Sequence, residues 1–449
     1  MAVTTIMLIE YKITGIRMTN GVESNNMLRF YNGKVITMNG GTEAVENEVW
    51  TDGAKICYVG PKRDDMPHFK REIDLHGDVI MPGFKNAHTH SAMTFLRSFA
   101  DDLPLARWLN EKVFPMEDKL TPDDVYIFTK LAILEYISSG ITSSFDMYFH
   151  LDAYAAANID CGFKTVICGA LTRYDKRRED IEDHYLKYNA LHPLIKYALG
   201  FHAEYTNDLD GLNYIAELSR KYSASVYSHN SETKSEVDEC IARHNMTPTE
   251  LFDSIGLFEH GGGGFHCTYM SDNDISIFAR KGLWAVTNPA SNLKLASGIA
   301  PVQKLLNAGV NMAIGTDGPA SNNALDMFRE MYLVTALQKY MENDAAACDA
   351  DTVLKMATSG GAYAMGLSDC DIIAEGKQAD MVVINMSRPN MQPVHDIAGN
   401  LVYSGSKENV RMTLVAGRIL YENGNFYVGE DIEKIYEKAN TALKKLLER

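Results

Sequence analysis

Short segments in which hydrophobic and polar residues alternate lie near both ends of the sequence. The stretches 28–37 and 55–59 show this alternation, which is typical of strands in a small sheet. After Gly376, further short strands are predicted at 380–384 and 410–418. The simplest arrangement combines both sets in one small β-sandwich built from the two ends of the chain.

From Val79 onward, the pattern changes to apolar runs that alternate with longer stretches of helical periodicity. Such alternation is typical of repeated β-α units. In one helical stretch, Leu212, Ile215, Leu218 and Tyr222 form a single apolar face. Eight apolar runs are candidate core strands, the number that a closed (β/α)8 barrel requires; they span 79–81, 141–145, 165–168, 197–201, 225–228, 264–267, 283–287 and 312–315.

We therefore expect an α/β fold in which a TIM-type (β/α)8 barrel carries the small β-sandwich. The tail of the chain has Ile435, Ala439, Leu443 and Leu447 at helical spacing, which predicts a terminal amphipathic helix. The expected segments are an N-terminal extension at 1–26 whose structural role the sequence leaves open, the sandwich at 27–82 and 377–428, the barrel at 83–376, and the C-terminal helix at 429–449.

Composition and charge narrow the range of partners. The chain has 449 residues, of which 46% are hydrophobic, so it can bury a large core. Its formal net charge of -16 and its pI of about 5.3 disfavour binding to nucleic acid or to an anionic membrane surface. The basic triplet Lys176–Arg178 is followed at once by Glu179 and Asp180, and we expect it to be a solvated loop.

The cysteines and the N-terminus indicate a cytoplasmic protein. Seven cysteines are scattered without CxxC spacing, which argues against a disulfide framework. The apolar patch at 6–9 is interrupted by Glu10 and Lys12 and lacks a basic start and a cleavage site. The sequence therefore predicts neither a secretory signal nor a membrane span.

The strongest local chemical signal is the segment Asn86–His90, which follows the first predicted strand and contains His88 and His90. Residues two apart in an extended chain point to the same side, so both imidazoles can face one cation.

Further side chains that bind metals or carry protons stand at the ends of later predicted strands. His202 follows the fourth strand, His229 follows the fifth, His266 lies at the end of the sixth, and Asp317 follows the eighth. Barrel enzymes place their catalytic groups at these strand ends. The pattern therefore predicts an active site at this end of the barrel.

The candidate residues lie in or between the motifs Asn86–His90, His229–Thr233, His266–Cys267, Asn288–Leu295 with Gly298–Pro301 close behind, and Gly315–Gly318. In these motifs the sequence resembles the amidohydrolase superfamily, specifically the branch of 5'-methylthioadenosine/S-adenosylhomocysteine deaminases and their chlorohydrolase and guanine-deaminase relatives. The resemblance covers nearly the whole chain from Met27.

The resemblance implies one divalent metal per chain, usually zinc, with iron and manganese as alternatives, held by His88, His90, His229 and Asp317. Three imidazoles and one carboxylate leave a position for water, as a catalytic site needs. A metal in such a site lowers the pKa of water to about 7.

The same resemblance, together with the chemistry of ring deamination, suggests catalytic roles for Glu232, His266 and Asp317. Glu232 is suited to move a proton from the attacking water to a ring nitrogen. His266 and Asp317 would hold that water and pass a second proton to the departing ammonia.

For substrate recognition, the resemblance points to Trp108, Glu117 and His202. A carboxylate such as Glu117 can accept two hydroxyl hydrogen bonds, which suits a ribose diol, while Trp108 offers an apolar wall. The glycine run 261–264 is not expected to hold a phosphate, because no Gly-Lys-Ser/Thr follows it and it enters a strand. We attribute this run to backbone flexibility.

The expected function is hydrolytic deamination of an aminated purine ring, most simply an adenosine-type nucleoside, by a homo-oligomer. Guanine, a pterin, an oxidised purine and a chlorinated triazine remain alternative substrates, and an inactive scaffold barrel is the alternative from another class.

The sequence departs from the pattern of this family at one position, which concerns recognition of the far end of the substrate. Relatives that accept S-adenosylhomocysteine carry an arginine just after the third strand, where this chain has Cys168, and Arg173, Arg177 or Arg178 would have to replace it.

Overall fold

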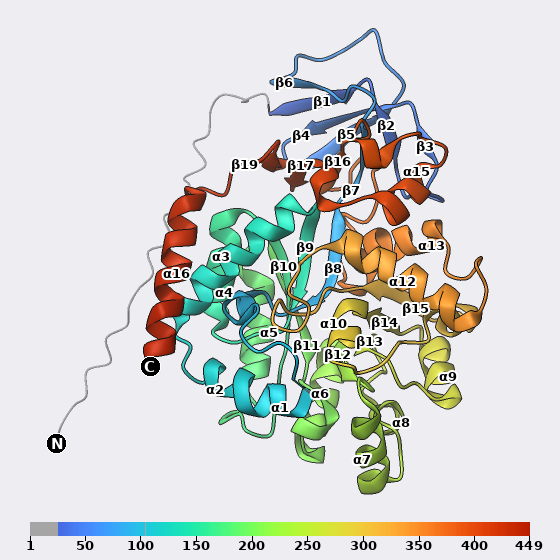
Figure 1. Ribbon diagram of the computed structural model, residues 1–449. Helices are drawn as coiled ribbons and strands as arrows, with labels where there is room; N and C mark the ends of the chain where they lie inside the picture. The colour runs from blue at the N-terminus through green and yellow to red at the C-terminus, as the bar shows by residue number, and fades with distance from the viewer. Residues whose placement is uncertain (1–25, 104) are drawn as a thin grey trace, which may run out of the picture.

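The computed structural model describes residues 26–103 and 105–449, so the predicted extension 1–26 lies outside the described residues except for Asn26. Figure 1 shows a barrel of parallel strands surrounded by helices, with a β-sandwich at one end. No helix in this part of the chain combines the length and the apolar character that crossing a membrane requires.

The barrel consists of eight strands that follow each other in sequence order around the sheet. Their register is parallel throughout. The backbone N–H of Asp317, just beyond the last strand, donates to the carbonyl of His88 in the first at 2.9 Å, which ties the two ends of the sheet together. The predicted TIM-type barrel is thereby confirmed. The strands are β8 (Phe84–Thr89), β9 (Ile141–Asp146), β10 (Lys164–Cys168), β11 (Ile195–Gly200), β12 (Val226–Asn230), β13 (Gly262–His266), β14 (Trp284–Thr287) and β15 (Asn311–Ile314).

The prediction of the first barrel strand was wrong. Residues 79–81 belong to β7 (Val79–Pro82), which pairs with β2 (Lys34–Ile36) and β16 (Met381–Ile384) in the sandwich. The chain passes from β7 into β8 at Gly83, where a Cβ atom would lie 2.1 Å from the Thr142 side chain. Because β8 buries polar residues at its functional end, it lacks the apolar run that marks the other strands.

Helices and short turns of helix connect the strands and cover the barrel (Figure 1). In α6, Leu212, Ile215 and Leu218 are buried as the periodicity predicts, whereas Tyr222 is partly buried. The helical segments around the barrel are η1 (Ser91–Leu96), α1 (Leu105–Trp108), η2 (Leu109–Val113), α2 (Phe114–Glu117), α3 (Pro122–Ser138), α4 (Leu151–Cys161), α5 (Asp180–Leu191), η3 (Glu204–Thr206), α6 (Leu209–Tyr222), α7 (Lys234–His244), α8 (Pro248–Ser254), α9 (Asp272–Lys281), α10 (Pro289–Lys294), α11 (Val302–Asn307), α12 (Met327–Glu342), α13 (Ala350–Lys355), η4 (Met356–Gly360) and α14 (Gly361–Ala364).

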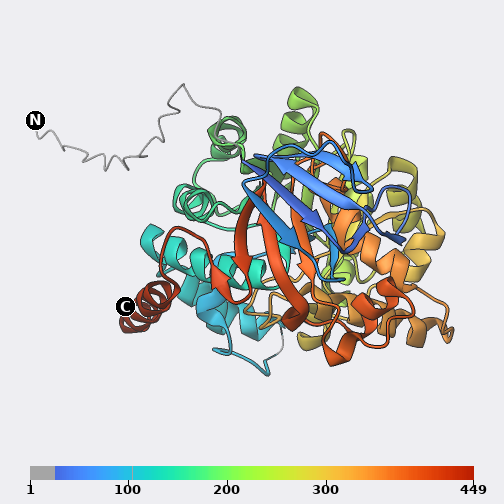
Figure 2. The same cartoon turned by 90° about the horizontal axis from the view of Figure 1, so that it is seen from above.

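The sandwich combines strands from both ends of the chain, as the alternating patterns predict (Figure 2). One sheet has the order β5-β4-β1-β6 and the other the order β19-β18-β17-β16-β7-β2-β3. Phe30, Ile80, Val383 and Met412 fill the shared core. The remaining elements of this region are β1 (Met27–Tyr31), β3 (Ala44–Val45), β4 (Glu48–Asp52), β5 (Lys55–Gly60), β6 (Arg71–Asp74), η5 (Pro389–Met391), α15 (Ile397–Gly399), η6 (Asn400–Ser404), η7 (Lys407–Asn409), β17 (Val410–Val415), β18 (Arg418–Glu422) and β19 (Asn425–Phe426).

The chain ends in α16 (Ile432–Glu448), which lies along α3 (Figure 1). Ile435 and Ala439 are buried as predicted, but Leu446 is buried in place of Leu447, which is 51% exposed. Each step of four residues turns by about 40° more than a full circle on a helix with 3.6 residues per turn. Residues that all lie four apart therefore move gradually away from the packed face, and the last of the four predicted positions is exposed.

Because β7 leads directly into β8, the sandwich lies at the amino ends of the barrel strands. The carboxyl ends and their loops therefore face away from it, and these loops carry the candidate site.

Candidate metal centre and active site

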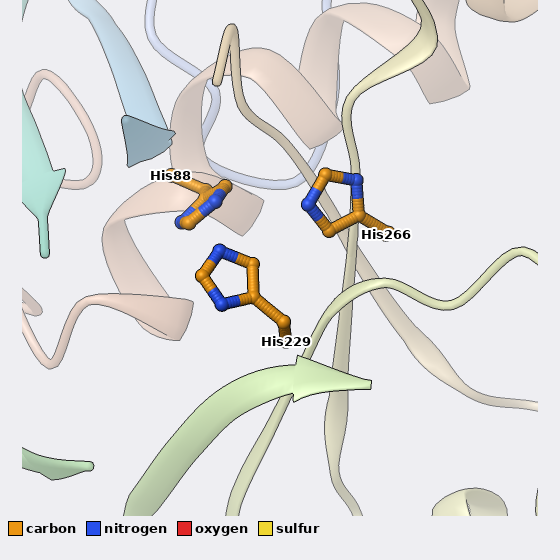
Figure 3. Close-up of side chains that lie close together, drawn as sticks. All are labelled: His88, His229 and His266. Atoms are coloured by element: carbon orange, nitrogen blue, oxygen red, sulfur yellow. The ribbon is translucent and has the colours of Figure 1, made fainter. Parts of the chain in front are cut away.

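Four histidines from three barrel strands converge at the carboxyl ends of the strands. His88 lies in β8 and His90 directly after it, and their ring centroids are 4.9 Å apart. His229 of β12 lies 5.0 Å from the His88 ring, and His266, the last residue of β13, lies 5.4 Å from the His229 ring. Figure 3 shows the rings of His88, His229 and His266 gathered around one point.

Asp317 completes this cluster from the loop after β15. Its Oδ1 atom lies 3.3 Å from His90 Nε2 and 3.6 Å from His88 Nε2. Ser291 Oγ and Ser321 Oγ donate to its Oδ2 at 2.5 and 2.9 Å, and the backbone N–H of Gly318 donates to Oδ1 at 2.7 Å. The structure thus brings together the four residues for which the sequence predicts metal binding.

The chemistry of this cluster fits a divalent metal. His88 is fully buried, and neither of its ring nitrogens has a hydrogen-bond partner among the described residues. An unpaired buried polar nitrogen is costly, and a bound cation would provide the missing partner. Burial, together with the neighbouring histidines, lowers the pKa values of His88 and His229 well below their usual range, so both rings are neutral, as metal ligation requires.

Two groups of three side chains each bring their potential ligand atoms within 4.8 Å of one another. One combines His88 with His90 and Asp317, and the other combines His88 with His229 and His266. His88 is common to both, so it stands at the centre of the cluster. Imidazole and carboxylate ligands suit zinc, and they also suit iron or manganese.

Backbone carbonyls orient two of these rings. The Nδ1 atom of His90 lies 2.7 Å from the carbonyl of Met147, and that of His229 lies 2.7 Å from the carbonyl of His202. When Nδ1 donates to a carbonyl, the neutral ring keeps its lone pair on Nε2, which faces the cluster.

Glu232 lies beside the cluster in the loop between β12 and α7. The residue is 8% exposed, and its Oε2 atom lies 3.8 Å from His266 Nε2. Its other oxygen, Oε1, accepts a hydrogen bond from Ser297 Oγ at 3.1 Å. His266 Nδ1 is bonded to Asn292 Oδ1 at 2.7 Å. Glu232 and His266, two of the three residues predicted to transfer protons, are therefore neighbours, each held by a separate polar side chain.

Three of these supporting residues carried no individual role in the sequence analysis. Ser291 and Asn292 lie within the motif Asn288–Leu295, so the motif was their only signal. Ser297 stands just outside it, and no local pattern distinguished it from a surface serine. Their roles follow from α10 and the loop after it, which fold over the carboxyl ends of β13 and β15.

The predicted substrate-binding residues lie at different depths. His202 is close to the cluster, with its ring 4.8 Å from that of His229, and burial lowers its pKa to about 4. Burial raises the pKa of Glu117 to about 8, an effect that the nearby Tyr148 hydroxyl partly opposes. Tyr148 follows Met147, the acceptor for His90, so Glu117 stands near the same end of the barrel. Trp108 is 6% exposed and belongs to the main hydrophobic core, and no polar contact of a described residue ties it to the histidines.

The arginines of the loop after β10 are exposed or partly exposed. Cys168 is buried at the end of the strand, whereas Arg173 is exposed with its guanidinium 5.1 Å from the Tyr174 ring centroid. Arg177 and Arg178 pair with acidic residues, Asp180 and Asp208.

The glycine run enters β13 as predicted, and Gly261 and Gly262 have positive φ values of 79° and 121°, a conformation that glycine adopts readily. Gly262 and Gly263 lie in β13, where added Cβ atoms would lie 1.9 Å from the Val226 carbonyl oxygen and 2.0 Å from the Trp284 carbonyl oxygen. These glycines allow neighbouring barrel strands to approach closely.

Comparison with known proteins identifies the family of the chain, which the geometry of the site alone leaves open. A family model described as "Amidohydrolase family" matches residues 79–420. The chain is 37% identical to the 5-methylthioadenosine/S-adenosylhomocysteine deaminase of Caldicellulosiruptor saccharolyticus, over 92% of this chain and 97% of the relative. An adenosine deaminase from Xanthomonas campestris with bound zinc superposes with a TM-score of 0.89 at 32% identity, covering 94% of this chain and 99% of that one. Atrazine chlorohydrolase from Arthrobacter aurescens has a TM-score of 0.86 at 22% identity, covering 93% of this chain and all (100%) of that one, which shows a shared fold alone.

Proposed function

The chain belongs to the amidohydrolase family, and from this premise we propose that it is a metal-dependent deaminase of adenosine-type nucleosides, which releases ammonia and leaves the inosine analogue. The observation that carries the proposal is the position of Glu232, whose free carboxylate oxygen lies 3.8 Å from His266 beside the histidine cluster. The deaminase names of relatives that match most of the chain support the reaction type.

His88, His90, His229 and Asp317 would hold the metal, and zinc is the metal bound by the Xanthomonas relative. When bound, such a metal lowers the pKa of water to about 7 and so supplies a nucleophile at neutral pH.

The side chains around the cluster then account for the proton transfers. Glu232 accepts a proton from the attacking water and delivers it to the ring nitrogen next to the carbon under attack. His266 and Asp317 orient the water and pass a second proton to the amino group, which leaves as ammonia while the ring carbon keeps the oxygen. Ser297 and Asn292 keep Glu232 and His266 in place during these steps.

On the substrate side, we propose that Glu117 and His202 bind the ribose and that Trp108 contributes an apolar wall. The buried carboxyl of Glu117 is suited to pair with hydroxyl groups rather than with a cation, because burial favours its neutral form. The adenosine deaminase name of a structural neighbour at 32% identity supports a nucleoside over a free base or a triazine.

The decisive experiment measures turnover by the purified protein, as ammonia release from 5'-methylthioadenosine, adenosine, S-adenosylhomocysteine, guanine and a pterin, and as chloride release from a chlorinated triazine. We expect the highest kcat/KM with one of the three nucleosides. Highest efficiency with guanine, the pterin or the triazine would overturn the substrate class, and no turnover by metal-loaded protein would favour the inactive scaffold.

We further propose that the protein is a cytoplasmic homo-oligomer. All seven cysteines are free thiols, as a reducing compartment maintains them. On α12, Tyr332 and Tyr340 expose 51% and 83% of their surface, respectively, which suits a face that a second copy covers.

A further inference from the structure

A second carboxylate is buried directly behind the turn that carries Glu232. Glu236, in the first turn of α7, is 5% exposed. Its Oε2 accepts hydrogen bonds from the backbone N–H groups of Glu232 at 2.7 Å and Thr233 at 3.4 Å, and its Oε1 accepts one from Ser231 at 3.1 Å. Three consecutive peptide N–H groups thus point at one carboxylate.

Helix capping explains only one of these bonds. Thr233 and Glu236 form the capping box of α7, in which Glu236 accepts from the N–H of Thr233 itself. The bonds to Glu232 and Ser231 reach beyond the helix into the preceding loop. Successive N–H groups that converge in this way form a concavity suited to a carboxylate. Here it holds a carboxyl group of the chain itself, whose pKa burial and the neighbouring Glu232 raise to about 7.

The turn needs such an anchor because its backbone is unfavourable. Ser231 has a φ of +52°, in the left-handed region that non-glycine residues rarely adopt because their Cβ atom crowds the backbone there. On the opposite side, the carbonyl of Ser231 accepts from the N–H groups of Thr268 and Tyr269 at 3.1 and 2.9 Å. The loop after β13 therefore holds one side of the turn and Glu236 holds the other.

The clamped turn determines where the Glu232 carboxylate points. Its backbone N–H is bonded to Glu236, its Oε1 accepts from Ser297, and its Oε2 is left to face His266. A glutamine at position 236 would still suit a capping box, but its amide nitrogen cannot accept, so Ser231 or Glu232 would lose its partner.

We propose that Glu236 is a positioning residue for Glu232: its carboxylate holds the 231–233 turn so that one oxygen of Glu232 faces His266. This inference rests on the proposed function, because it assigns Glu232 to proton transfer. Glu236 itself touches neither the histidine cluster nor, on this proposal, the substrate.

The test compares Glu236→Gln with Glu239→Gln, a matched change at a side chain that is 66% exposed on the same helix. Loss of a hydrogen bond to a charged group corresponds to a change of about 10- to 100-fold in a rate constant. We therefore expect kcat of Glu236→Gln to fall by about this factor. Its KM and metal content should stay at the wild-type values, and Glu239→Gln should match wild type throughout. An unchanged kcat, or a rise in KM alone, would overturn the proposal.

A double variant separates positioning from general destabilisation. If Glu236 acts through Glu232, the change Glu236→Gln should reduce kcat much less in a Glu232→Gln background than in wild type. An equal fold decrease in kcat in both backgrounds would contradict the proposal. If Glu236→Gln does not fold, Glu236→Asp replaces it in the test. The aspartate keeps the carboxylate but places it one methylene further from the turn. Wild-type kcat in Glu236→Asp would equally overturn the inference.

A structural readout keeps this test independent of the proposed reaction. In crystals of Glu236→Gln, we expect the 231–233 turn to shift and the Glu232 carboxylate to leave Ser297. An unmoved carboxylate would refute the positioning role even if the wild-type protein proved not to be a deaminase. Absence of ammonia release by wild type, with the expected shift in the variant, would instead refute the proposed function alone.

Discussion

Asp317 Oδ1 lies 3.3 Å from His90 Nε2, although Asp317 follows the last strand of the barrel and His90 follows the first. The pair meets only because β15 closes against β8, where the N–H of Asp317 bonds to the carbonyl of His88. Closure of the barrel therefore brings Asp317 to His88 and His90, and metal binding at these residues should stabilise the closed barrel.

The first prediction concerns metal content. Wild-type protein should contain one transition metal per chain, and His229→Ala should lose most of it, because one of the predicted ligands is removed. A chelator should lower the Tm of wild type but hardly that of the variant. Elemental analysis and thermal unfolding measure both effects, with the exposed His76→Ala as the control. Undiminished metal in His229→Ala would show that the ligand assignment is wrong.

The second prediction separates chemistry from metal binding. Glu232→Gln preserves the shape and the contact with Ser297 but cannot accept a proton. Its kcat should fall by about 10²- to 10⁴-fold, the usual value of a positioned proton carrier, while its metal content stays at wild type. Near wild-type turnover in this variant would remove Glu232 from the mechanism.

The third prediction concerns the pH dependence of stability. Burial raises the pKa of Glu117 from 4.5 to about 8 in the folded protein. Between these values the folded carboxyl keeps a proton that the unfolded chain releases, so the free energy of unfolding contributed by this group falls as pH rises. Glu117→Gln is neutral in both states and removes this contribution. Thermal unfolding from about pH 5 to pH 8 should therefore show a smaller decrease in Tm for the variant than for wild type. Parallel curves would mean that Glu117 is not buried in its protonated form.

The fourth prediction addresses the far end of the substrate. Because Cys168 supplies no cation and Arg173 faces solvent, nucleosides with a neutral 5' group should be preferred over S-adenosylhomocysteine. A missing charge-assisted hydrogen bond corresponds to about 10- to 100-fold in kcat/KM.

Steady-state kinetics of 5'-methylthioadenosine, adenosine and S-adenosylhomocysteine with wild type, Arg173→Ala and the control Arg177→Ala provide the measurement. If S-adenosylhomocysteine is the best substrate of wild type and loses efficiency selectively in Arg173→Ala, Arg173 reaches the substrate and the preference is refuted.

The fifth prediction concerns assembly. Light scattering at micromolar concentration should give a mass that is a multiple of 50.0 kDa. Tyr340→Glu, which places a charge on the exposed face of α12, should weaken the assembly, whereas the same change at the exposed Tyr174 should not. A wild-type species of single-chain mass would contradict the proposal.

Local patterns predicted most of the barrel because the signals of strands and helices are themselves local. Seven of the eight apolar runs overlap barrel strands, and the apolar stripe of α6 faces inward. The failure at 79–81 has the same cause. A strand that buries the polar side chains Lys85, Asn86 and His88 has no apolar run, so the pattern marks the neighbouring sandwich strand instead.

The fold class and the residue types of the site could be predicted from local patterns, since His88, His90, His229, His266 and Asp317 each stand at or just beyond a strand end. How these residues are held depends on contacts between loops that are far apart in the sequence. The bonds from Ser297 to Glu232 and from Asn292 to His266, and the three peptide N–H groups on Glu236, join side chains and backbone from separate loops. Such contacts depend on where the loops fold over the strand ends. The spacing of residues along the chain contains no information about how close two loops come in space.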